Sequence, residues 1–146
     1  MKSFLFACSL LILCPCMIAA QTRPLVPAES RAVPYDGVLP ACEASSVLGE
    51  IESSFKSREK SYWDSDLVIL SFQNMQEIGY RPMGADLVPR RYCRASVVTS
   101  DQKIRDLSYS IGEREGLIGF TWGTEWCVAG LDRNYAFGLE CRSARP

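Results

Sequence analysis

The sequence predicts an α+β fold in which one amphipathic helix packs on a four- to five-stranded antiparallel sheet braced by disulfides. Three observations support it: one early run with helical periodicity, several later runs rich in β-branched and aromatic residues, and an even number of cysteines after a signal-like N-terminus. Residues 42–146 are predicted to form this single domain.

The first twenty residues are typical of a secretory signal peptide. Lys2 supplies the positive charge, residues 4–18 form an apolar core, and Ala19 and Ala20 precede the expected cleavage point. A spanning helix needs about twenty apolar residues, so we expect export to the periplasm or the extracellular space and no membrane span in the mature chain. A lipidation box ending at Cys8 is the alternative, but it lies too near the start of the chain.

Residues 21–41 are predicted to form an extended arm, because they carry four prolines and no sustained periodicity. Without Lys2 the chain has fifteen basic and seventeen acidic residues. Nucleic-acid-binding proteins usually have a marked basic excess. The balance of charge therefore argues against a nucleic-acid partner.

Histidine is absent from the sequence. This excludes serine–histidine and cysteine–histidine nucleophilic pairs and most catalytic zinc or non-haem iron sites. We assign no catalytic residue, no metal ligand and no cofactor.

An amphipathic helix is predicted over residues 45–61, with Ser45 or Ser46 as its N-cap. The apolar positions that recur at helical spacing are Val47, Leu48, Ile51, Phe55 and Tyr62. Charged residues, Glu59 among them, occupy much of the remainder. The apolar stripe needs a sheet to cover.

The sheet is predicted from four later runs. A strand over residues 67–72 bends on toward Tyr80, and two runs at 91–99 and 103–111 flank the polar turn "SDQ". Centring that hairpin on Asp101 places Cys93, Ala95 and Val97 opposite Tyr109, Leu107 and Arg105 on one mostly apolar face. Arg94, Ser96, Asp106 and Ser108 take the other face, which we expect to be solvated.

After "GEREG" comes one bent strand, or two short strands broken near Gly123, then a last strand at about 135–141 and a short basic tail. The helix and sheet together resemble the curved sheets of cystatin-like and nuclear-transport-factor-like proteins, although such a layout implies no function.

The four cysteines outside the signal segment are predicted to form disulfides. Asn134 lies midway between Cys127 and Cys141, so a hairpin around "GLDRN" would place the two opposite each other, about 5 Å apart. Cys42–Cys93 follows by elimination. A four-thiolate zinc site or a redox centre would need closely spaced cysteine pairs, which the sequence lacks.

The segments "RYCRA", "YSIGE", "GFTWGTEWCVAGLDRNYAF" and "CRSARP" resemble a family of small exported proteins, chiefly alphaproteobacterial, that have no assigned activity. The match covers about residues 40–146 and is most specific in "EWCV-GLDRN-A" and the last cysteine. The resemblance implies an exported bacterial protein of periplasmic type and supplies no catalytic residue. Its cysteine pair agrees with the predicted disulfide.

A binding groove is hypothesised around the aromatic, glycine-rich segment of residues 120–137, because exposed rings beside carboxylates bind sugars and peptides. The residues assigned to it are Trp122, Glu125, Trp126, Asp132 and Tyr135, flanked by Phe120 and Phe137. The simpler interpretation, which strand periodicity favours, is that alternate rings fill the core beneath the helix. Asp132 and Arg133 are most simply turn formers, linked to each other or to Glu125.

Charged residues give two further hypotheses. Glu113, Glu115 and Glu125 could supply a glycosidase-type carboxylate pair, although solvated surface is the simpler interpretation. Arg90, Arg91 and Arg94 could contact an anionic partner, but strand alternation separates Arg91 from the other two.

The expected function is that of an exported, non-enzymatic binding protein that acts on a protein or on the cell envelope, peptidoglycan included. The alternatives are a cell-wall hydrolase that uses paired carboxylates and, by analogy only, a lysozyme or protease inhibitor.

Overall fold

The computed structural model describes residues 35–81 and 88–146. The predicted signal peptide and residues 21–34 of the predicted arm lie outside the described residues. Within the described residues the chain forms one long helix and four strands, which confirms the α+β class. In chain order the elements are α1 (Ser45–Trp63), β1 (Ile69–Arg81), β2 (Arg90–Thr99), β3 (Ile104–Gly112), η1 (Leu117–Gly119), β4 (Gly123–Val128) and η2 (Leu139–Ala144). The elements η1 and η2 are short 3-10 segments.

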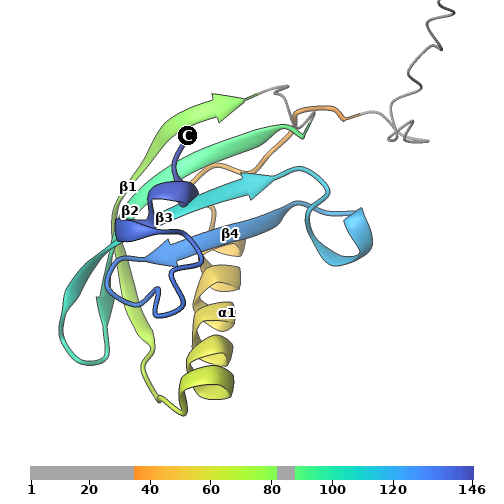
Figure 1. Cartoon of the computed structure of the whole chain (residues 1–146). Coiled ribbons are helices and arrows are strands. Elements are labelled where there is room, and N and C mark those ends of the chain that lie inside the picture. The colour runs from red at the N-terminus through yellow and green to blue at the C-terminus, as the bar shows by residue number, and fades with distance from the viewer. Residues whose placement is uncertain (1–34, 82–87) are drawn as a thin grey trace, which may run out of the picture. The chain divides into compact units, whose positions relative to one another are not determined.

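The four strands form one antiparallel sheet in the order β1-β2-β3-β4, so that each strand pairs with its neighbour in sequence (Figure 1). The predicted β2–β3 register is confirmed: Cys93 lies opposite Tyr109, and Ala95 lies opposite Leu107. The polar turn at 100–103 and the alternation of apolar residues are both local signals, and they agree with each other.

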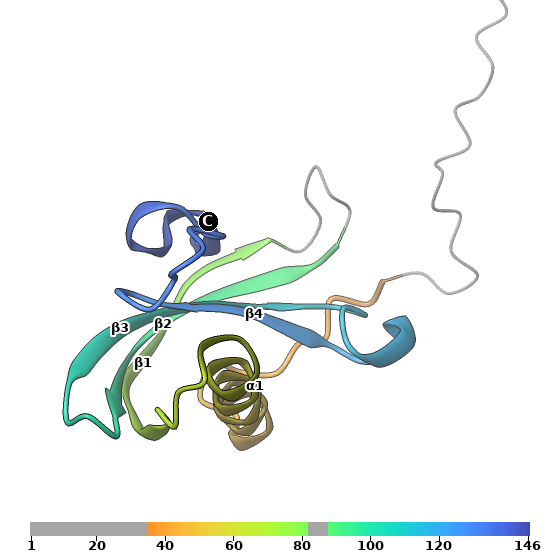
Figure 2. The same cartoon turned by 60° about the horizontal axis from the view of Figure 1, so that its bottom comes forward.

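Helix α1 covers one face of the sheet (Figure 2). Val47, Ile51 and Phe55 are at most 1% exposed, as the predicted stripe requires. Tyr62, which we assigned to the same stripe, is 74% exposed. The predicted serine caps are also wrong, because Ala44 occupies the N-cap and no side chain caps the helix there.

The C-terminal segment covers the opposite face of the sheet (Figure 2). Cys141 is bonded to Cys127 of β4, and the Arg145 Nε atom donates to the Ser108 Oγ atom at 3.4 Å. Ala144 is buried, so residues 142–146 are a packed segment where we expected a tail. Ser108, which we predicted to be solvated, is only 2% exposed for the same reason.

The predicted strand at 135–141 is wrong. Tyr135, Glu140 and Cys141 have positive φ angles, between 51° and 59°, which extended strands do not use. The Cys127–Cys141 disulfide is nevertheless formed, with a Cα–Cα distance of 5.6 Å. The pairing was therefore predicted correctly from a hairpin that does not exist.

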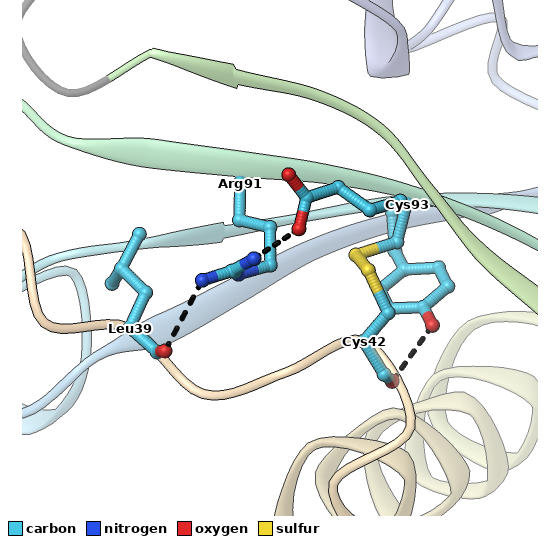
Figure 3. The surroundings of a disulfide bond; sticks show 6 residues. Leu39, Cys42, Arg91 and Cys93 are labelled. Atoms are coloured by element: carbon cyan, nitrogen blue, oxygen red, sulfur yellow. Dashed lines mark hydrogen bonds and ion pairs between the residues drawn. A yellow bond between two sulfur atoms is a disulfide. The ribbon is translucent and has the colours of Figure 1, made fainter.

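The Cys42–Cys93 disulfide joins the segment before α1 to β2 (Figure 3). The Tyr109 hydroxyl donates to the Cys42 carbonyl oxygen at 2.8 Å. Burial raises the pKa of Tyr109 to about 12, so the hydroxyl keeps its proton at neutral pH. Arg91 forms an ion pair with Glu77 on the same face of the sheet as Cys93. Both predicted disulfides are thus confirmed.

Residues 35–41 of the predicted arm pack against the domain. The Asp36 and Gly37 backbone N–H groups donate to the Glu113 carboxylate at 2.9 and 2.8 Å, and the Tyr80 hydroxyl donates to the Gly37 carbonyl oxygen at 2.7 Å. Residues 35–41, which we assigned to the arm, are therefore part of the domain.

In the part of the chain that is described, no helix has both the length and the apolar character to cross a membrane.

Candidate functional site

A groove of about 390 Å³ lies between the C-terminal half of α1 and the loop at residues 131–137; we call it the α1–loop groove. Its volume falls within the range of about 300 to 1,000 Å³ that is usual for small-ligand sites. Its walls come from segments far apart in the sequence, and Trp126 of β4 lies between them.

Asp132 shapes the loop wall of the groove. Its carboxylate accepts hydrogen bonds from the Ala136 and Phe137 backbone N–H groups at 3.0 and 2.8 Å. The Cys127–Cys141 disulfide closes the longer segment that contains this loop. Asp132 is therefore a turn former, as the sequence indicates, and it also lines the groove.

Glu59 and Arg133 tie the loop to the helix. The Arg133 guanidinium donates to both Glu59 carboxylate oxygens at 3.0 Å, a two-bond geometry that is among the stronger ion-pair arrangements. Glu59 is 3% exposed, and the Arg133 guanidinium lies 4.9 Å from the Trp63 ring centroid. Our predicted partners of Arg133, Asp132 and Glu125, were wrong.

The sequence interpretation missed Glu59 because it grouped this residue with the charged positions outside the apolar stripe. The signal was present in the spacing: Glu59 follows Phe55 by four positions and continues the stripe of Val47 and Ile51. A carboxylate on a buried stripe needs a cation, and the loop provides one.

Arg58 lies over the face of Trp126, with the guanidinium carbon 4.1 Å from the ring centroid. Trp126 is 5% exposed, packs 5.7 Å from Phe55, and donates from Nε1 to the Ser54 Oγ atom at 3.3 Å. The core interpretation therefore holds for Trp126, although its edge also lines the groove.

The five residues that we assigned to one binding site lie in different places. Trp126 and Asp132 line the α1–loop groove, whereas Trp122 lines a separate concavity of about 320 Å³ with Phe120 and Glu113. Tyr135 is 71% exposed and lines neither. The hypothesised single site is thus divided.

Glu125 lies on the sheet face opposite α1. There Glu125 and Glu115 both form ion pairs with Arg90. The Arg90 guanidinium donates to Glu125 at 2.6 Å and to Ser110 at 3.0 Å, and it also forms an ion pair with Glu115. Burial raises the pKa of Glu115, Arg90 opposes that rise, and Glu125 adds to it. Glu113 instead holds residues 36 and 37, so it does not belong to this carboxylate pair.

The predicted basic cluster does not form one patch. Arg90 and Arg91 bind carboxylates on opposite faces of the sheet, and Arg94 pairs with Asp106 at 3.0 Å. This confirms the separation that strand alternation predicted.

The η1 loop between β3 and β4 presents apolar side chains to solvent. Leu117, Ile118 and Phe120 are each more than 80% exposed. The prediction that alternate rings fill the core is therefore wrong for Phe120.

Among residues 35–81 and 88–146, no group of three or more acidic or cysteine side chains is placed to hold a metal ion. No protein-family model matches the chain, and comparisons with curated proteins and with solved structures give no significant match.

Proposed function

We propose that this chain is an exported, non-enzymatic binding protein whose ligand site is the α1–loop groove, and that its partner is a protein or a component of the cell envelope. The observation that carries the proposal is the construction of the groove: a helix forms one wall, a disulfide-closed loop forms the other, and Glu59 and Arg133 link them. A site with fixed walls binds with little loss of conformational entropy.

Export is supported by the apolar N-terminal segment and by the resemblance to small exported alphaproteobacterial proteins. The two disulfides are compatible with an oxidising compartment, where such bonds persist.

The charged side chains in the groove favour recognition over catalysis. Glu59 is neutralised by Arg133, and both oxygens of Asp132 accept backbone hydrogen bonds. Both carboxylates are therefore occupied by these partners, and neither is placed to exchange a proton with a substrate, as general acid–base catalysis requires. The groove offers shape, apolar surface and hydrogen bonding.

Titration of the ¹⁵N-labelled protein with peptidoglycan fragments and with short peptides tests this proposal. We expect chemical-shift changes at the Trp63 and Trp126 indole N–H groups and along residues 131–137. Tyr62→Ala should weaken binding at least fivefold, because the exposed Tyr62 ring lines the groove.

Tyr135→Ala is the matched control, since Tyr135 is exposed to a similar extent and, although it belongs to the loop, is not among the residues that line the groove. Shifts confined to Trp122 and the η1 loop would place the site elsewhere and contradict the proposal.

A carboxylate hydrolase is the second candidate, and the meeting of Glu115 with Glu125 at Arg90 favours it. The raised pKa of Glu115 is the kind of shift that a general acid needs. If this candidate is right, the protein cleaves peptidoglycan and Glu125→Gln abolishes turnover. Absence of cleavage by the wild-type protein, or full activity in the variant, excludes it.

A further inference from the structure

We infer that the α1–loop groove binds the free C-terminus of a peptide whose last residue has a large apolar side chain. This inference rests on the proposed function and names its ligand. The terminal carboxylate would bind Arg58, and the apolar side chain would lie against Leu131, Phe137 and Tyr62 at the groove surface.

The charges that line the groove identify Arg58 as the contact for an anion. Glu59 and Arg133 neutralise each other, and Asp132 is bound by two backbone N–H groups. Among the described residues, Arg58 has no carboxylate within ion-pair distance, and its guanidinium is held over Trp126. A guanidinium fixed in this way can bind a carboxylate with two hydrogen bonds at reduced entropic cost.

The aromatic rings argue against a cationic ligand. An aromatic site that binds a cation must present free ring faces. Here Arg58 lies over Trp126, and Arg133 lies over Trp63. These two indole rings already carry the protein's own cations, so a cationic ligand could use neither of them without displacing Arg58 or Arg133.

The net charge favours a monoanion over a phosphate dianion. Of the two arginines among the described residues that line the groove, Arg133 is paired with Glu59 and Arg58 has no acidic partner, and Glu59 and Asp132 line the same groove. A carboxylate matches one guanidinium in charge and in planar geometry.

The apolar part of the surface favours a large terminal side chain. Leu131 and Phe137 are partly buried and Tyr62 is 74% exposed, so together they offer apolar contact area beside the cation. Burying a leucine side chain there contributes to affinity, whereas the single methyl group of a terminal alanine covers little of this area. This favours a protein C-terminus over a D-alanine-terminated stem peptide.

Calorimetric titration of the full chain, with both disulfides intact, against matched peptides tests the inference. The probes are an acetylated pentapeptide ending in leucine, as the free acid and as the C-terminal amide, and the same peptide ending in D-alanine. We expect the leucine acid to bind at least tenfold more tightly than either of the other two. Raising the salt concentration should weaken the binding of the acid and leave the binding of the amide unchanged.

Arg58→Gln should reduce the affinity of the acid to that of the amide, and Arg58→Lys should give an intermediate value. Lys56→Gln is the matched control, because Lys56 lies on the same helix, is exposed and is outside the groove. Thermal unfolding of each variant verifies that the fold is retained.

The outcomes separate the inference from the proposed function. Equal binding of acid and amide at the groove, or an acid preference that survives Arg58→Gln, overturns the carboxylate assignment and leaves the groove as a binding site. Tighter binding of the D-alanine peptide overturns the choice of a protein C-terminus over a stem peptide as the ligand. If no peptide or peptidoglycan fragment perturbs the groove, both the inference and the proposed function fail.

Discussion

At the scale of single residues, Glu59 and Arg133 connect the stability of the domain to the geometry of its groove. The Glu59 carboxylate is 3% exposed, whereas the Arg133 side chain is 32% exposed. Removing the cation would leave a buried charge without its hydrogen-bonding partner, which costs more than the pair itself contributes.

Arg133→Gln should therefore lower the free energy of unfolding by about 3 kcal/mol. Urea denaturation followed by far-ultraviolet circular dichroism measures this change. Lys60→Gln is the comparison, because its partners Asp64 and Asp66 are exposed and such a pair contributes less than about 1 kcal/mol. Equal losses of unfolding free energy in the two variants would show that the buried pair contributes no more to stability than the exposed pairs.

The residues of the candidate site could be predicted only in part. Trp126 and Asp132 were found because the segment that contains them is dense in aromatics and turn formers. Arg58 and Glu59 were missed, because the contact between α1 and the loop joins residues 74 positions apart and leaves no local pattern. The position of Glu59, four residues after Phe55, was the one usable signal.

At the scale of elements, the β2–β3 hairpin ends in a charged turn. Arg105 and Thr99 bind the Asp101 carboxylate, and the Arg105 hydrogen bond is the main reason that the pKa of Asp101 lies well below its usual range. A carboxyl whose pKa is lowered by folding stabilises the fold above its unfolded pKa of about 3.9. That contribution is lost as the pH falls from this value toward the lower folded pKa.

Asp101→Asn should therefore lower the melting temperature at pH 7, and the difference from the wild type should shrink between pH 5 and pH 2. Melting temperatures across this range provide the measurement. A difference that does not change with pH would contradict the assigned ionisation of Asp101.

The two disulfides also stabilise the arrangement of the elements. Cys127 and Cys141 are separated by 14 positions, and Cys42 and Cys93 by 51. In the chain-entropy account, loops of this length correspond to about 3 and 4 kcal/mol.

We expect the double variant Cys127→Ser with Cys141→Ser to lose up to about 3 kcal/mol of unfolding free energy. It should also lose affinity at the groove, because one wall is no longer closed. The variant Cys42→Ser with Cys93→Ser should lose at least as much stability and keep more of the affinity once folded. Denaturation and peptide titration of both variants test this, and the opposite order of affinities would refute it.

Short-range sequence patterns predicted the β2–β3 hairpin and the buried face of α1. The β2–β3 register followed from period-two alternation around a polar turn, and the buried face of α1 followed from helical spacing. The segment after β4 could not be predicted, because Tyr135, Glu140 and Cys141 adopt positive φ without being glycine.

At the scale of the whole domain, the sheet is covered on both faces: by α1 on one and by the C-terminal segment on the other (Figure 2). Arg145 reaches Ser108 in β3, and a side-chain carbon at Gly79 in β1 would lie 3.2 Å from the Pro146 ring. The last residues therefore cross the sheet toward its far edge.

Deleting residues 142–146 should lower the free energy of unfolding by about 1 to 2 kcal/mol, from lost hydrogen bonds and the burial of Ala144. The newly exposed sheet face should also bind more of an apolar fluorescent dye. Unchanged stability and dye binding would mean that this segment is not part of the packed structure.

The connectivity of the two cross-links has a consequence for how the chain is made. Cys42 joins Cys93 and Cys127 joins Cys141, so the two covalent rings follow one another along the polypeptide and do not interleave. Synthesis delivers the N-terminal residues first. If the expected signal segment is excluded, Cys42 is the only unpaired cysteine when Cys93 emerges, and Cys127 is the only one when Cys141 emerges. Each ring can therefore close with the correct pairing, and no rearrangement of disulfides is required.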